Sequence, residues 1–235
     1  MLDIDQERMS DWAAGAGQTL HGPREEDLFA FTQELASGNI KRWRHGDCCD
    51  SVVANGSIGW ILSGSARKFL TLRNGHRRII DLIMPGDFFG MRVDAAQRFS
   101  YEASTNGAMT AKITRGEFNA LAETRPRFFR IFHERACQTI GRLEEHILVQ
   151  GCTSSTHKIA GYLLLMSRRL SENQDAAVSL PMSRYDIADH LGIAVETVSR
   201  GITELRRQGV IELQTPRRVA IRNAEKLAEA VPEFP

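Results

Sequence analysis

Residues 180–205 read LPMSRYDIADHLGIAVETVSRGITEL, and this stretch decides the fold of the C-terminal third of the chain. Ser183, with Asp186 three residues later, resembles a capping box, which predicts that a helix begins here. Ala188 is small enough for a second helix to cross the first, and Gly192 permits a tight turn between the two. The stretch therefore predicts a helix-turn-helix.

The second predicted helix, roughly residues 195–208, has one apolar and one polar face. Apolar residues at spacings of four and three predict its buried face: Val198, Ile202 and Leu205. The opposite face of its first turn and a half carries Val195, Glu196, Ser199 and Arg200. Arginine can donate two hydrogen bonds to guanine, glutamate can accept one from cytosine, and a valine methyl suits a thymine methyl. We therefore predict that these four residues contact base edges in the major groove of DNA, which the N-terminus of such a helix enters.

Two short apolar runs after residue 209 predict a β-hairpin beside the two helices. The runs are Val210–Leu213 and Val219–Ile221, and the turn between them carries Arg217 and Arg218. Cations in this turn would lie on phosphate, as a wing does. The full set of predicted phosphate contacts is Ser183, Arg184, Thr197, Arg217 and Arg218.

A simpler interpretation of this pattern stays open. Any helical hairpin shows such apolar spacing, and Glu196 with Arg200 makes an ordinary i,i+4 pair. Charge gives DNA binding little support, because the chain holds 30 basic and 29 acidic residues, a net charge of +1. Residues 180–223 hold seven arginines against five acids, which is only +2. The glycine turn, the small Ala188 and the trailing wing nevertheless favour DNA binding.

Upstream of this motif, residues 127–151 predict one long helix, with Pro126 at its start and Gly151 at its end. It carries apolar residues on more than one face, so it has more to bury than one domain supplies. We predict a homodimer interface formed by Phe132, Ile140, Leu143 and Ile147, the last three spaced as in a short coiled coil. The alternative is that this stripe packs on the N-terminal domain.

Short apolar runs broken by turns fill residues 40–126. Asn74-Gly75 is a strong hairpin signal, and Pro85-Gly86-Asp87 predicts a second tight turn. Many short strands at this spacing favour a small antiparallel roll.

The predicted fold class is α+β: an antiparallel β-roll, a long dimerisation helix and a winged helix-turn-helix. The predicted domains are an N-terminal extension with a short helix (1–39), the roll (40–126), the dimerisation helix (127–151), the DNA-binding domain (152–223) and a C-terminal tail (224–235). The composition, 42% hydrophobic and 25% charged, is that of an ordinary globular protein. Without an apolar run of membrane-spanning length or a basic, apolar leader, we expect a cytoplasmic protein without membrane contacts and with reduced thiols.

In the order and spacing of these features the chain resembles the Crp–Fnr superfamily of bacterial transcription regulators. The resemblance rests on Ile61-Leu62-Ser63-Gly64, then Asn74-Gly75, then the run from Pro85 to Gly90 in the roll. Within the superfamily, Glu196-Thr-Val-Ser199-Arg200 and Tyr101-Glu102-Ala103 are most similar to the FixK and Fnr branches.

This resemblance implies a cyclic-nucleotide-binding-like roll and a homodimer that binds double-stranded DNA at a palindrome such as TTGAT-N4-ATCAA. It also implies activation through contact with RNA polymerase, at genes for low-oxygen respiration, denitrification or nitrogen fixation.

Departures from the family pattern bear on what the protein senses. Cyclic-nucleotide binders carry Gly-Glu and Arg-Ser, whereas here Met91 follows Gly90 and Phe99 follows Arg98. No cysteine precedes Cys48, so the thiolates of an Fnr-type iron–sulfur cluster are missing. In the pattern His45-x-x-Cys48-Cys49, the named residues supply only three metal ligands, two of them adjacent. We therefore expect no cofactor and no metal. Two alternatives stay open: haem ligation by His21, His45 or His76, and a thiol switch at any of the four cysteines.

An enzymatic function finds no support, because the sequence has no glycine-rich nucleotide loop, nucleophile elbow or zinc-protease motif. The alternative from another class is a ligand-sensing or scaffold dimer with a β-roll that does not bind DNA. Such a protein would not need charged residues on the outward face of the second helix.

Overall fold

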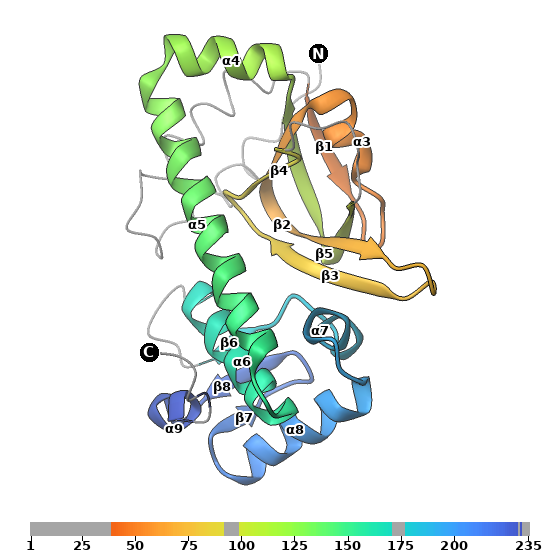
Figure 1. Ribbon diagram of the computed structural model, residues 1–235, viewed down its shortest axis with the longest axis vertical. Helices are drawn as coiled ribbons and strands as arrows, with labels where there is room; N and C mark the ends of the chain where they lie inside the picture. Colours follow the sequence, from red (N-terminus) through yellow and green to blue (C-terminus); the bar gives the residue numbers. More distant parts are fainter. Residues whose placement is uncertain (1–38, 92–98, 171–176, 230, 232–235) are drawn as a thin grey trace. The chain divides into compact units, whose positions relative to one another are not determined.

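The computed structural model describes residues 39–91, 99–170, 177–229 and 231, and Figure 1 shows their helices and strands. The short helix expected in the N-terminal extension lies outside the described residues. The chain forms two compact units. One comprises the residues before 70 together with 82–139, and the other comprises 70–81 together with the residues from 140 onward.

The predicted antiparallel roll makes up most of the first unit. The strands of the roll are β1 (Ile40–Trp43), β2 (Ile58–Thr71), β3 (Arg77–Ile83), β4 (Phe88–Phe89) and β5 (Ser100–Ile113), and the sheet order is β1-β5-β2-β3 with β4 on β2. The end of β2 and most of β3 fall within the second unit. β5 runs antiparallel to both β1 and β2. β2 and β5 lie closely together at Gly64 and Gly107, both at positive φ, where a Cβ on Gly64 would lie 2.2 Å from the Gly107 carbonyl oxygen.

Alternation along β2 divides the first unit into two apolar clusters. Ile58, Trp60 and Leu62 contribute to a cluster that also contains Phe118 and Phe128 from two helices. Ile61 belongs to the other cluster, which fills the roll with residues from α3 (Asp50–Val53) and its neighbouring strands. The roll is therefore closed on one side by helices.

Two helices follow the roll. α4 (Arg115–Thr124) begins with a capping box of Thr114 and Glu117, which the sequence analysis missed because it assigned these residues to the roll. α5 (Pro126–Gly151) is the long predicted helix, continuous over 26 residues. Proline suits its first position because an N–H there would lack an intrahelical acceptor.

The second unit is a winged helix. It contains α6 (Ser155–Leu170), β6 (Ala177–Ser179), α7 (Arg184–Leu191), α8 (Val195–Arg207), β7 (Ile211–Leu213), β8 (Arg218–Ile221) and α9 (Ala224–Glu229). The strands form an antiparallel sheet in the order β6-β8-β7. β6 has no counterpart among the predicted strands, because it depends on backbone pairing with β8, which lies far along the chain. The last helix contacts α6 and buries Leu227, and Val231 after the helix is also buried, so this segment packs on the second unit.

The predicted α+β fold class, with its antiparallel roll, long helix and winged helix-turn-helix, is confirmed by these elements. In the part of the chain that the structure describes, no helix is both long and apolar enough to cross a membrane.

Candidate nucleic-acid interface

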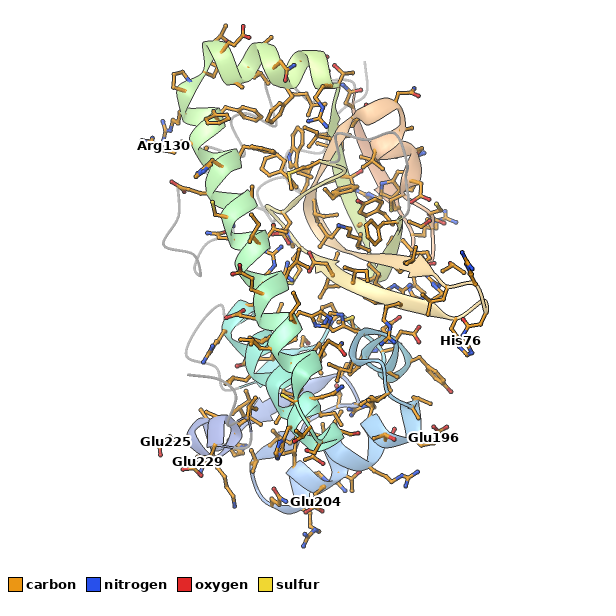
Figure 2. All side chains as sticks on the ribbon, in the orientation of Figure 1. His76, Arg130, Glu196, Glu204, Glu225 and Glu229 are labelled. Atoms are coloured by element: carbon orange, nitrogen blue, oxygen red, sulfur yellow. The ribbon has the colours of Figure 1, made fainter. Side chains whose placement is uncertain are left out.

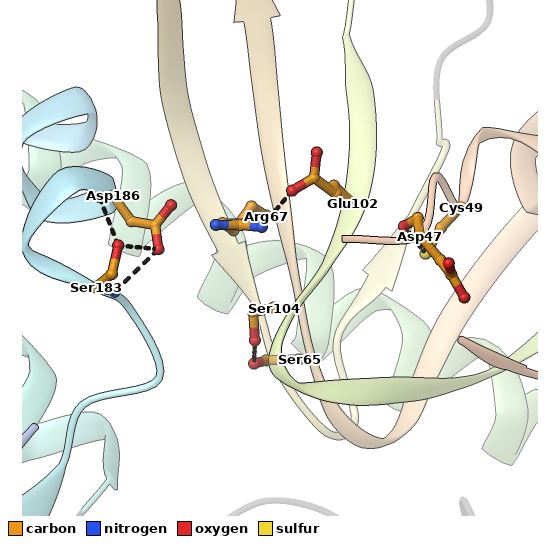
Figure 3. A network of polar contacts seen from close by, with 8 residues as sticks. All are labelled: Asp47, Cys49, Ser65, Arg67, Glu102, Ser104, Ser183 and Asp186. Atoms are coloured by element: carbon orange, nitrogen blue, oxygen red, sulfur yellow. Dashed lines mark hydrogen bonds and ion pairs between the residues drawn. The ribbon is translucent and has the colours of Figure 1, made fainter. Parts of the chain in front are cut away.

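A reciprocal capping box fixes the start of α7. The Ser183 hydroxyl accepts a hydrogen bond from the Asp186 backbone N–H at 3.1 Å, and the Asp186 carboxylate accepts from the Ser183 backbone N–H and hydroxyl at 2.9 and 2.8 Å (Figure 3). Both polar groups of Ser183 are thus used inside the helix start. Ser183 acts as the cap of α7, and its hydroxyl proton is directed to Asp186 rather than outward to phosphate.

The turn and the buried face of α8 have the geometry that the sequence pattern predicted. Gly192 ends α7 in the left-handed conformation at φ 66°. Val198, Ile202 and Leu205 are at most 1% exposed. Gly201 adds a close contact, since a Cβ there would lie 2.3 Å from Ile159 Cδ1 on α6.

The outward face of α8 begins at its N-terminus. Glu196, Ser199 and Arg200 are exposed, and Val195 is half-buried. Ala194 occupies the N-cap and supplies no side-chain acceptor, so the first-turn N–H groups point past the helix end without a capping side chain. Backbone N–H groups in this arrangement attract anions such as phosphate.

Glu196 and Arg200 are not paired with each other. Among the described residues, neither side chain makes a hydrogen bond or ion pair, although they lie at i,i+4. Glu204, two turns further along α8, accepts hydrogen bonds from Arg207 at 2.7 and 2.9 Å and from Gln208 at 2.7 Å, and the Arg207 hydrogen bonds lower the pKa of Glu204 to about 2. Figure 2 shows Glu196 and Glu204 along this helix. The side chains of Glu196 and Arg200, near the N-terminus of α8, are therefore available for hydrogen bonds to another molecule. Glu204, nearer the C-terminal end, already accepts hydrogen bonds within the chain.

The wing presents two cations. Thr215 Oγ1 accepts hydrogen bonds from the backbone N–H groups of Arg217 and Arg218, at 3.3 and 2.9 Å, and so shapes the turn between β7 and β8. Both arginines are exposed. Arg184 differs, because its guanidinium donates to the Pro216 carbonyl at 3.3 Å and its partial burial lowers its pKa. Arg184 thus ties the wing to the start of α7, and Thr197 is half-buried on α8.

Tyr185 is a candidate contact that the sequence analysis missed. It follows Arg184 on the first turn of α7, and 72% of its surface is exposed. A tyrosine hydroxyl can donate to a phosphate oxygen, and the first helix of a helix-turn-helix crosses the DNA backbone. Its position two residues after the N-cap was the signal available in the sequence.

α5 leaves a stripe of side chains uncovered. Ile140 and Ile147 are 57% and 67% exposed, which is unusual for isoleucine on a regular helix, and Leu143 beside them is half-buried. Phe132, grouped with them in the predicted interface, instead stacks edge-on against Phe88 and Phe118 within its own chain. Its neighbours come from β4 and α4, which the spacing along α5 alone could not reveal.

Polar groups inside the roll pair with one another. Arg67 on β2 makes an ion pair with Glu102 on β5, and Ser65 hydrogen-bonds Ser104 on the same two strands (Figure 3). Of the residues named for nucleotide or haem binding, Arg98 and His21 lie outside the described residues.

Burial shifts the pKa of both thiols in the roll upward. Burial raises the pKa of Cys49 to about 12, and desolvation also raises that of Cys48. Cys152 is buried, and Cys137 is exposed on α5. Across the described ranges, no group of three or more His, Cys, Asp or Glu side chains of one chain is placed to hold a metal ion.

Comparison with known proteins places this geometry in a family. Residues 157–230 match the Crp-like helix-turn-helix domain. One curated relative is "Nitrogen fixation regulation protein FixK" from Bradyrhizobium diazoefficiens, which is 37% identical over 65% of this chain. A second relative is the protein of the same name from Azorhizobium caulinodans. It is 33% identical, and the match covers 76% of this chain and 72% of that protein. The chain spans 65% of the length of the Bradyrhizobium relative.

A solved structure agrees with these matches. The structure of FixK2 from Bradyrhizobium japonicum superposes with a TM-score of 0.71 at 27% identity, covering 81% of this chain and 96% of that one. The relatives are regulators and not enzymes, which confirms that expectation. The chain therefore belongs to the Crp–Fnr superfamily of helix-turn-helix transcription regulators, and within it to the FixK type.

Proposed function

We propose that this protein is a homodimeric transcription activator that binds a TTGAT-N4-ATCAA-like palindrome through α8. The observation that carries the proposal is the state of Glu196 and Arg200: both are exposed on the first turns of α8, and neither makes a hydrogen bond or ion pair within the described chain. Groups left in this state can bond to base edges without first breaking an internal contact. The alternative, a scaffold that does not bind DNA, gives no reason for Glu196 and Arg200 to be exposed and unpaired.

Each outward side chain suits a base of the proposed half-site. Arg200 would donate two hydrogen bonds to guanine O6 and N7, and Glu196 would accept from the N4 amino group of a cytosine. Ser199 and the half-buried Val195 would contact thymine, the valine through the thymine methyl group. Together these four residues would supply the sequence preference.

The proposed phosphate contacts take account of which polar groups are already hydrogen-bonded within the chain. Arg217 and Arg218 on the wing, Tyr185 on α7 and the N-terminus of α8 would hold the backbone, with Thr197 beside the helix start. Ser183 and Arg184 would act indirectly, because the first caps α7 and the second holds the wing.

A palindrome is bound by two copies of the same reading helix, so the proposal requires a homodimer. The exposed stripe of α5 offers the surface for it, since Ile140 and Ile147 would be covered by a second copy. In the cytoplasm, the bound dimer would activate by contact with RNA polymerase. The name shared by the two FixK relatives favours nitrogen-fixation genes, or related genes for low-oxygen respiration and denitrification, as its targets.

The test compares duplexes that differ only in their spacer. Fluorescence anisotropy would measure binding to TTGAT-N4-ATCAA, to the same half-sites separated by nine base pairs, and to a scrambled duplex. Five additional base pairs turn one half-site by about half a helical turn, so a rigid dimer can no longer contact both. We expect affinity to fall on the order of 100-fold with the longer spacer. Equal affinity for all three duplexes would contradict sequence-specific reading and favour the scaffold alternative.

A further inference from the structure

A histidine and a cysteine lie side by side on the exposed stripe of α5. Cys137 Sγ is 3.8 Å from His133 Nε2 and 4.0 Å from Nδ1, and both residues are exposed. In a tetrahedral zinc site, Zn–S bonds of about 2.3 Å and Zn–N bonds of about 2.0–2.1 Å place the sulfur and nitrogen about 3.6 Å apart. The two side chains therefore already have nearly the separation of two zinc ligands.

This pair lies on the same stripe as the exposed isoleucines. His133, Ile140 and Ile147 follow one another at intervals of seven residues, and Cys137 lies between the first two, four residues after His133 and three before Ile140. All four side chains are exposed on one continuous helix. With His133, Ile140 and Ile147 at the d positions of this repeat and Cys137 at an a position, each of these side chains faces its equivalent across the two-fold axis of a parallel pair, and Leu143 flanks the seam.

The symmetry of such a pairing completes the ligand set. Each copy contributes one imidazole and one thiol, so two copies supply two of each, which is a ligand set of structural zinc sites. One chain supplies only two ligands, in keeping with the absence of any larger group of metal-ligating side chains within the described chain. Our expectation of no metal considered one chain at a time and could not include this pair.

Charge also favours a divalent ion at this place. Two cysteine thiolates would cancel the two positive charges of the ion, so the seam would receive a neutral group despite the exposed Arg130 one turn before His133 (Figure 2). Binding would release the two thiol protons, since thiolate is the form that ligates.

We propose that the homodimer holds one zinc ion between His133 and Cys137 of one copy and the same residues of the second copy. This inference rests on the homodimer of the proposed function, which it deepens by making dimer stability responsive to zinc. The ion would bind the paired chains and not the single chain, so it would tighten self-association by mass action.

The test uses the full chain, treated with a chelator and kept reduced. Cobalt(II) chloride would be titrated into it, because tetrahedral cobalt with thiolate ligands gives strong visible and charge-transfer bands, and zinc chloride would then displace it. Sedimentation would follow the oligomeric state of the same samples. The variants are His133→Ala and Cys137→Ser, and Cys48→Ser is the matched control, an exposed cysteine outside α5.

We expect saturation at one cobalt per two chains, loss of the bands in both seam variants, and unchanged bands in the control. Zinc should lower the dimer dissociation constant on the order of 10-fold or more. A dimer without these bands, one metal per chain, bands that survive both variants, or an exclusive Cys137 disulfide between copies would each overturn the zinc site and leave the proposed DNA-binding dimer intact. A chain that stays monomeric at all concentrations, with and without zinc, would overturn the homodimer itself and the site with it.

Discussion

At the scale of single residues, the chain separates groups that support the reading helix from groups left to contact DNA. Ser183 and Arg184, although polar and close to the expected DNA surface, have their hydrogen bonds directed to Asp186 and Pro216. Glu196 and Arg200 have no such partner within the described residues. A residue's type and position therefore do not decide its role, because the role depends on whether its polar groups are already used.

Arg200→Ala should weaken operator binding and relax base preference. A bidentate guanine contact is worth about 1–3 kcal/mol. The substitution removes it from both half-sites, so we expect a cost of about 2–6 kcal/mol, or roughly 30-fold to 20,000-fold, at fixed salt. The measurement is a competition titration against TTGAT-N4-ATCAA and duplexes altered at the guanine.

Arg206→Ala is the matched control for this substitution. Arg206 is also exposed on α8, but it lies near the C-terminal end of the helix, away from the expected groove. Arg206→Ala should leave the base preference of operator binding unchanged. If Arg200→Ala weakened binding evenly across all duplexes, Arg200 would bind the DNA backbone and the assignment of the reading face would be wrong.

The wing arginines should show a different signature. Arg217→Ala and Arg218→Ala should weaken all sequences alike if both side chains lie on phosphate. Each phosphate that a cation neutralises adds about 0.9 to the slope of log affinity against log salt, so either substitution should flatten the slope of a dimer by roughly two units. Titrations at four salt concentrations, on the palindrome and on a scrambled duplex, measure this slope. An unchanged slope would place these side chains off the DNA.

At the scale of the elements, α8 is positioned by its close approach to α6 at Gly201. A Cβ there would meet Ile159 Cδ1 at 2.3 Å, whereas the next Ile159 atom would be 3.6 Å away. Gly201→Ala should therefore destabilise the native chain by about 1–3 kcal/mol through overpacking, although alanine is the better helix former. Urea unfolding measures the change.

The Ile159→Val background provides the control for this contact, because valine lacks the Cδ1 methyl group. Ile159→Val alone should cost about 0.5–1.5 kcal/mol. In that background Gly201→Ala should become neutral or stabilise by up to about 1 kcal/mol from helix propensity. Equal costs in both backgrounds would show that the two residues do not interact.

Two stacked histidines connect α5 with α7 in the second unit. The His146 and His190 rings lie 4.0 Å apart, and His190 Nδ1 donates to the Ile79 carbonyl at 3.2 Å. Burial, with nearby Arg78, lowers the pKa of His146 to about 4. The pKa of His190 is lowered to about 3, mainly by burial and then by electrostatic interaction with His146, Arg169 and Arg78. The hydrogen bond to the Ile79 backbone acts in the opposite direction and raises this pKa.

This pair should make the second unit sensitive to acid. Because both folded-state pKa values lie below the unfolded value of about 6.5, the unfolded chain binds more protons and stability is lost as pH falls below 6.5. Between pH 6.5 and 5 we expect a loss of roughly 2–4 kcal/mol. The double variant His146→Gln/His190→Gln should show a flatter dependence in urea unfolding, and an equally steep one would contradict the assignment.

Much of the second unit follows from local sequence, and much of the first does not. The capping box at Ser183, the glycine turn and the buried stripe of α8 are patterns within a few residues, so spacing alone predicts them. The contacts of Phe132 could not be predicted in this way, because its partners, Phe88 and Phe118, lie 44 and 14 residues away in the chain. β6 likewise depends on pairing with β8, some 40 residues later. The exposed side of α5 depends on which residues pack against the helix, so spacing along α5 alone could not reveal it.

At the scale of the whole molecule, the reading helix functions only if two copies are held together, and α5 is the element that would hold them. Ile140 and Ile147 occupy equivalent positions seven residues apart, and both are more than half exposed. An Ile140→Glu/Leu143→Glu variant should place like charges in this seam and give monomers in sedimentation. Leu72→Glu is the control, the same substitution at an exposed apolar residue between β2 and β3. A dimer that survives the α5 substitutions would exclude this seam.

A charge exchange at Ile147 tests the symmetry of the pairing as well as its existence. If each Ile147 faces its own copy across the two-fold axis, Ile147→Glu and Ile147→Lys should each dimerise poorly because like charges would meet. An equimolar mixture should form the heterodimer, since opposite charges then face each other, and it should regain affinity for the palindrome. The difference in dimerisation between the separate variants and their mixture should shrink as salt screens the charges. Sedimentation and anisotropy of the two variants, separately and mixed, measure both properties. Variants that dimerise equally well alone and mixed would show that Ile147 does not meet itself, which would also remove the geometry that brings the two His133–Cys137 pairs together.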